Sequence, residues 1–122
     1  MSRNEELFRK VADAIEREPE SYDQGWFFRD LGCGTTACIA GWAVALAKHQ
    51  GNLSAACRSY PDAVNEWMLL EPESIPATAL LGLTTDDASY LFGQGWRPHD
   101  GLSVPDALRK IGEGAAIEDV SA

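Results

Sequence analysis

The sequence contains no apolar run approaching the roughly 20 residues that a membrane-spanning helix needs. Its first residues show no apolar stretch behind a basic patch, so we expect no secretory signal. Only three cysteines occur, and this small odd number is not typical of a disulfide framework. Together these absences predict a cytoplasmic protein that does not bind a membrane.

The signatures of the common enzyme classes are also missing. The 122 residues contain no phosphate-binding Gly-x-x-x-x-Gly-Lys-Ser/Thr, no Gly-x-Gly-x-x-Gly, no His-Glu-x-x-His and no Gly-x-Ser-x-Gly. The adjacent carboxylates of Asp86 and Asp87 would point in different directions on a helix, so we expect them to favour a helix start. We therefore predict no catalytic residue, no cofactor and no enzyme activity.

Basic residues are scarce in the second half of the chain. The formal net charge is −9, and residues 61–122 carry 3 basic against 11 acidic residues, with no Lys or Arg between Arg58 and Arg97. Such a charge repels phosphate backbones, which disfavours direct nucleic-acid binding, and it attracts a basic protein surface. The alternative is that the acidic residues only keep a small domain in solution.

The apolar pattern predicts helices. Leu7, Phe8, Val11, Ala14 and Ile15 follow a period of 3.6 residues, on a helix that we expect to begin at a Ser2–Glu5 capping box and to end near residue 17 or 18, before Pro19. Residues 37–47 are all apolar or Gly, which predicts a central helix over about 36–50, buried on every side. Thr35 or Thr36 would cap its start, and Gly51 with Asn52 would end it.

Shorter helices are expected in the second half, over about 54–60, 62–70, 77–81, 86–92 and from 105 onward, and a helical turn is expected over 21–28. Thr84 with Asp87 and Ser103 with Asp106 form capping-box patterns. No period-2 alternation of useful length is present, so a large sheet is excluded. The fold class is therefore all-α: one domain over 1–122, a compact orthogonal bundle around the central helix, with 113–122 expected to fray.

The segment 33–38 before the central helix is the most distinctive in the chain, and it has three interpretations. A metal site would use Cys33, Cys38, His49 and Cys57, but 11 residues of one helix separate Cys38 from His49 by about 16 Å. Alternatively, a thiolate at Cys33 would be activated by the helix N-terminus. The interpretation we prefer, which includes a Cys33–Cys38 disulfide as a variant, is a structural motif that binds no metal. Its residues are Cys33, Gly34, Thr35, Cys38, Gly41 and Trp42.

The glycine-rich loop 93–101 is the best candidate for recognition. Trp96 and Arg97 are residue types that anchor interfaces, because they combine a large contact area with hydrogen-bonding ends. The alternative is that Trp96 folds back over the core.

The chain resembles a family of small uncharacterised proteins of bacteria and their phages. The resemblance rests on Tyr22-Asp23-Gln24 before Trp26, on the motif that runs from Cys33 to Trp42, and on segments 80–83, 88–92 and 96–98, so it covers most of residues 19–98. The resemblance implies a phage or mobile-element setting, and it supplies no catalytic residue.

These observations predict an acidic, non-enzymatic protein-binding module that recognises a partner with a basic surface. If the protein is phage-encoded, it would act in the host cytoplasm as an inhibitor of a host or defence protein. A small thiol-dependent enzyme or redox sensor using Cys33 is the alternative, and self-association as a homodimer is a third possibility. The expected partner-binding residues are Asp62, Glu66, Glu71, Glu73, Asp86, Asp87, Trp96 and Arg97.

Overall fold

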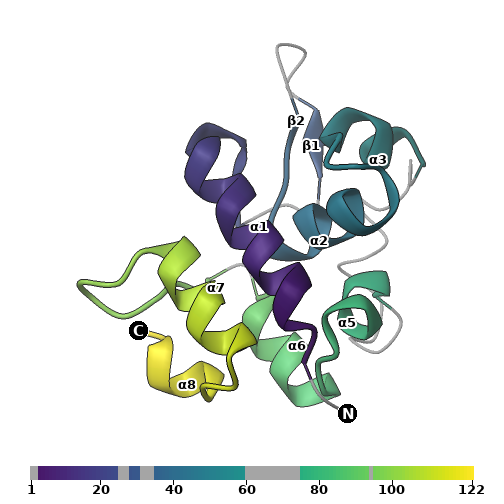
Figure 1. Cartoon of the computed structure of the whole chain (residues 1–122). Helices are drawn as coiled ribbons and strands as arrows, with labels where there is room; N and C mark the ends of the chain where they lie inside the picture. Colours follow the sequence, from purple (N-terminus) through teal and green to yellow (C-terminus); the bar gives the residue numbers. More distant parts are fainter. Residues whose placement is uncertain (1–2, 25–27, 31–34, 60–74, 94) are drawn as a thin grey trace.

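The computed structural model describes residues 3–24, 28–30, 35–59, 75–93 and 95–122 (Figure 1). The described part is mostly helical, and its helices pack against one another, which confirms the all-α class. The helices are α1 (Glu5–Arg17), α2 (Ile39–Lys48), α3 (Leu53–Ser59), α5 (Pro76–Leu81), α6 (Thr85–Leu91), α7 (Val104–Gly112) and α8 (Ile117–Val120), with a 3₁₀ turn η1 (Pro19–Ser21). None of these helices is long and apolar enough to cross a membrane.

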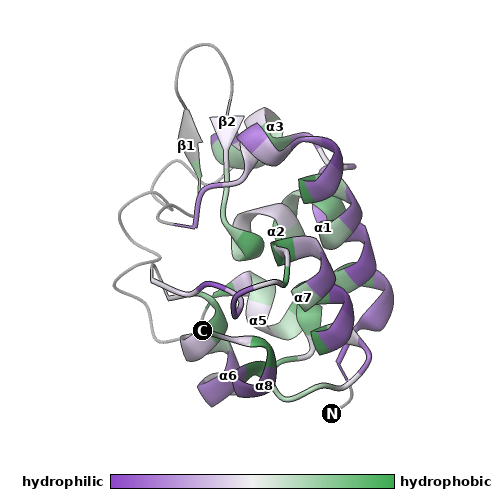
Figure 2. Cartoon of the chain, turned by 90° about the vertical axis from the view of Figure 1, so that its left-hand side faces the viewer, coloured by the Kyte–Doolittle hydropathy of each residue, from purple (hydrophilic) through white to green (hydrophobic). Residues whose placement is uncertain are grey.

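Helix α1 crosses the middle of the molecule, with α7 on one side and α2 and α5 on the other (Figure 1). Its predicted apolar face is buried, and its polar face lies outward (Figure 2). The expected Ser2 cap is wrong, because the helix begins at Glu5 and the side chain of Asn4 accepts the Leu7 N–H at 3.1 Å. The helix ends at Arg17, before Pro19, as the sequence predicts.

The central helix is shorter than the predicted 36–50. Thr35 and Thr36 do not cap it; they form strand β2 (Thr35–Thr36), which pairs antiparallel with β1 (Arg29–Asp30). Cys38 is the N-cap residue, and burial on all sides is limited to Ile39–Ala45, since Leu46 is half-buried. The helix stops at Lys48, and residues 49–52 form the turn, with Gly51 in the left-handed region at φ +84°.

The capping residues predicted for two of the shorter helices, α6 and α7, are found in the structure. The side chains of Thr84 and Ser103 cap α6 and α7 by accepting the N–H groups of Asp87 and Asp106, each at 3.2 Å. The helical turn expected over 21–28 is not found at its start, since η1 ends at Ser21 and Tyr22 is extended, while residues 25–27 lie outside the described residues. The expected helix over 62–70 lies outside the described residues.

The expectation of a frayed tail over 113–122 is wrong. Helix α8 buries Ile117 and Val120, and the chain after it pairs with the segment 97–99. The Ala122 N–H donates to the Arg97 carbonyl at 3.0 Å, and the His99 N–H donates to the Val120 carbonyl at 3.0 Å. This end of the chain is therefore part of the core.

Candidate functional site

The cysteine at the start of α2 is buried and protonated. Burial raises the pKa of Cys38 from 9.0 to about 11, although the nearby backbone N–H groups of Ala40 and Gly41 act in the opposite direction. Cys38 is a free thiol, so the Cys33–Cys38 disulfide is not formed. A buried thiol with a raised pKa is a poor nucleophile at neutral pH. Cys33 and Gly34 lie outside the described residues.

The rest of the Thr35–Trp42 motif holds α2 against its neighbours. Trp42 is only 2% exposed, and its indole N–H donates to the Ser21 carbonyl at 3.2 Å. The hydroxyl of Thr35 lies 3.0 Å from that of Ser54 at the start of α3. Gly41 is buried on the face of α2 that packs in the core. These contacts join α2 to η1 and β2 to α3, as a structural role of the motif requires.

The predicted acidic residues divide into two groups. Asp62, Glu66, Glu71 and Glu73 lie outside the described residues. Asp86 is exposed, whereas Asp87 is half-buried and pairs with Arg3 at 3.2 Å.

Arg3 brings the start of α6 close to the start of α8. Besides pairing with Asp87, its guanidinium donates to the carbonyl of Ile111 at 2.8 Å and to that of Ala115. Helices α6 and α8 contact each other and lie together at one end of the molecule (Figures 1 and 2). Their first turns carry four carboxylates, which we name the acidic face: Asp86, Asp87, Glu118 and Asp119.

Trp96 is not an exposed anchor. It is 8% exposed, and its indole N–H donates to the hydroxyl of Ser121 at 2.8 Å, so the alternative in which Trp96 folds back over the core is the one observed. Arg97 beside it is exposed. The two residues line a shallow depression of about 260 Å³, together with Tyr90 and Ser121.

Tyr90 is the surface residue that the sequence analysis missed. At 49% exposure it is the exposed large hydrophobic side chain of the described part of the chain. It lies four residues after Asp86, so the two residues share one outward face of α6. The signal in the sequence was this i, i+4 spacing opposite the buried Ala88 and Leu91.

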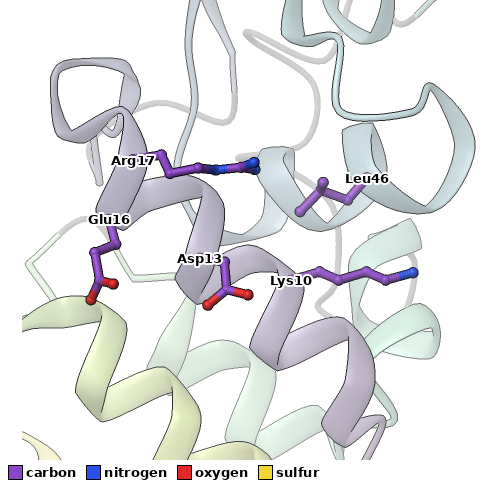
Figure 3. Close-up of a pocket in the computed structure, with 5 residues that line it drawn as sticks. All are labelled: Lys10, Asp13, Glu16, Arg17 and Leu46. Atoms are coloured by element: carbon purple, nitrogen blue, oxygen red, sulfur yellow. The ribbon is translucent and has the colours of Figure 1, made fainter.

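A second hollow lies between α1 and α2 (Figure 3). This groove of about 320 Å³ is lined by Lys10, Asp13, Glu16, Arg17 and Leu46. It is open to solvent and mixes both signs of charge with one apolar side chain.

Within the described ranges, no group of three or more His, Cys, Asp or Glu residues could hold a metal ion.

Comparison with known proteins gives no match to any family model, any curated protein or any solved structure.

Proposed function

We propose that the protein is a non-enzymatic binding module, which presents the acidic face of α6 and α8 to a partner protein with a basic surface. The observation that carries the proposal is that two helices in contact, α6 and α8, both carry carboxylates in their first turns, and that α6 also carries the exposed Tyr90. The net charge of −9 extends the same preference over longer range, because it steers a cationic partner and repels nucleic acid.

The chemistry of the face suits protein recognition. Carboxylates provide charge complementarity, which sets the association rate and the choice of partner. Tyr90 supplies a rigid apolar contact with a polar end, and Arg97 lies across the neighbouring depression. Tyr and Arg are the residue types that most often dominate interface energies.

The resemblance to phage and bacterial proteins adds a biological setting to the proposal. In the cytoplasm of a host, the acidic face would imitate a phosphate backbone and occupy the nucleic-acid-binding surface of a host or defence protein. Inhibition by occupation requires no catalytic residue.

The test is affinity purification of the tagged protein from its natural host, at low and at high salt. We expect a stoichiometric partner at low salt that is lost at high salt, because exposed charges are screened within about 10 Å at 0.1 M salt. The double variant Asp86→Asn/Asp119→Asn should lose the partner. The matched control Glu6→Gln/Glu20→Gln removes two exposed charges elsewhere and should retain it.

Retention of the partner by Asp86→Asn/Asp119→Asn would refute the acidic face as the binding site. Absence of any stoichiometric partner at low salt would count against a binding module altogether. Tyr90→Ala provides a third variant, which should weaken capture at low salt although it removes no charge, because it removes an apolar contact.

A further inference from the structure

The groove between α1 and α2 has its own pattern of charge, separate from the acidic face. Figure 3 shows the side chains of Lys10 and Arg17 reaching across from α1, with Leu46 of α2 between their ends. The side chains of Asp13 and Glu16 leave the same helix but point toward α7. Asp13 and Glu16 also line the groove, but their carboxylates are directed toward α7, whereas Lys10 and Arg17 extend toward α2.

Arg109 on α7 explains why the carboxylates of Asp13 and Glu16 are directed toward α7. Its guanidinium donates to Asp13 at 2.8 Å and to the two carboxylate oxygens of Glu16 at 3.0 and 3.3 Å. These hydrogen bonds raise the pKa of Arg109, and the one to Glu16 has the largest effect. The guanidinium therefore stays positively charged. Both carboxylates that line the groove are therefore already paired with Arg109.

The cations of the groove remain available. Arg17 is exposed, and within the described part of the chain no ion pair engages its guanidinium. Lys10 pairs with Glu6 at 3.4 Å, but both side chains are exposed, and an exposed pair of this kind is weak. A stronger acceptor can displace it. Leu46 is half-buried, so part of its apolar surface faces solvent.

We propose that this groove binds an acidic peptide segment of a partner protein in extended conformation. One carboxylate of the peptide pairs with Arg17, a second pairs with Lys10, and an apolar side chain between them packs on Leu46. An acidic peptide is favoured over nucleic acid, since a chain of net charge −9 repels a polyanion while a short segment carries few charges.

The spacing of the groove defines the peptide. Lys10 and Arg17 are seven residues apart on one helix, which places them about 10 Å apart along its axis. In an extended strand, residues i, i+2 and i+4 share one face, and i to i+4 spans about 13 Å. The long side chains of Lys and Arg accommodate the difference. The pattern is therefore acidic-x-apolar-x-acidic.

The probe is the blocked peptide acetyl-Ser-Glu-Ser-Leu-Ser-Glu-Ser-amide, titrated into the ¹⁵N-labelled full chain and followed by NMR. We expect saturable shifts at the amides of Lys10, Arg17 and Leu46. The same peptide with Gln in place of Glu should produce none. Lys10→Gln/Arg17→Gln should weaken binding about threefold or more, because it removes two ion pairs in a solvent-exposed groove. The control Arg58→Gln/Lys110→Gln should leave the affinity unchanged.

Arg109→Gln provides a more specific test, because Arg109 is not among the residues that line the groove. Its loss frees Asp13 and Glu16, and the affinity should fall; adding Asp13→Asn/Glu16→Gln to this variant should restore it. Equal binding of the Gln peptide, or shifts that map elsewhere, would overturn the proposal. A single-stranded oligonucleotide that produces the same shifts would refute the acidic peptide as the ligand. Each variant is first compared with the parent by circular dichroism, and none of these outcomes depends on the acidic face.

Discussion

The side-chain amide of Gln24 donates a hydrogen bond to the carbonyl oxygen of Leu91, 67 residues away in the chain, at 2.9 Å. The same amide nitrogen donates to the carbonyl of Gly93 at 2.7 Å, and its oxygen accepts the Tyr22 hydroxyl at 2.6 Å. The last carbonyls of a helix have no partner within it. Gln24 therefore completes the C-terminal end of α6 and joins it to the segment that leads to the central helix.

Gln24→Ala should destabilise the protein by about 1–3 kcal/mol, because it leaves partly buried carbonyls without a donor. Tyr22→Phe removes only the hydroxyl that donates to Gln24, and should cost about 1 kcal/mol. Urea denaturation followed by circular dichroism measures both values. If the two variants were equally stable, the link from Gln24 to α6 would contribute nothing.

Gly112→Ala should destabilise the contact between α1 and α7. A Cβ atom at residue 112 would lie 2.7 Å from the Cβ of Phe8, which is itself fully buried and cannot move freely. We expect a loss of about 1–3 kcal/mol from overpacking, reduced by the better helix propensity of Ala. Gly95→Ala is the control, since an added Cβ there meets no atom within 4 Å. If the unfolding midpoint of Gly112→Ala equalled that of the parent, α1 and α7 would accommodate the added methyl group without loss of stability.

The elements that the sequence predicts well are those set by local interactions. The apolar period of α1, the caps at Thr84 and Ser103 and the left-handed Gly82 that ends α5 all depend on residues within four positions of one another. Thr35 and Thr36 show the limit of this reasoning. A threonine before an apolar run is typical of a helix cap, but pairing with β1, which local pattern does not reveal, holds both residues in a strand.

The candidate site was harder to predict for the same reason. Whether Trp96 faces solvent depends on Ser121, 25 residues later, and the order of that tail depends in turn on the segment 97–99. Asp86 and Asp87 are neighbours in sequence, yet Arg3 engages only the second. Charge composition indicates an acidic surface but does not say which carboxylates remain exposed.

Ile117→Ala tests whether the C-terminal segment belongs to the core. Ile117 is buried in α8, and truncating a buried isoleucine to alanine costs about 2–5 kcal/mol. The neighbouring Glu118 is exposed, so Glu118→Ala should change stability by no more than about 0.5 kcal/mol. Urea denaturation compares the two variants, and hydrogen exchange at the amide of His99 reports whether its bond to Val120 opens. If the two substitutions changed the stability equally, residues 113–122 would be frayed, as the sequence predicts.

The thiol of Cys38 should make stability depend on pH in the alkaline range. Because burial raises its pKa from 9.0 to about 11, the folded state holds the proton more tightly than the unfolded state. This contribution to stability is present in full below pH 9 and is lost as the pH rises toward 11. Burial also raises the pKa of Tyr22 from its ordinary value of 10.0, so this phenol adds a further loss of stability above about pH 10, in the parent and in a Cys38 variant alike.

The measurement is the urea midpoint of the parent and of Cys38→Ala at pH 7, 9 and 10.5. Other groups that titrate in this range are common to both proteins, so the difference between them isolates the thiol. Cys38→Ala should be the less stable protein at pH 7, because it leaves a small cavity, and the gap should narrow at pH 10.5. If the difference in stability between the two proteins stayed constant from pH 7 to 10.5, the Cys38 thiol would have the same pKa in the folded and unfolded states. Burial at the start of α2 would then not raise the pKa of this thiol. Alkylation at pH 7.5 provides an independent check, since the native Cys38 thiol should react only after urea unfolds the chain, whereas the half-buried Cys57 should react earlier.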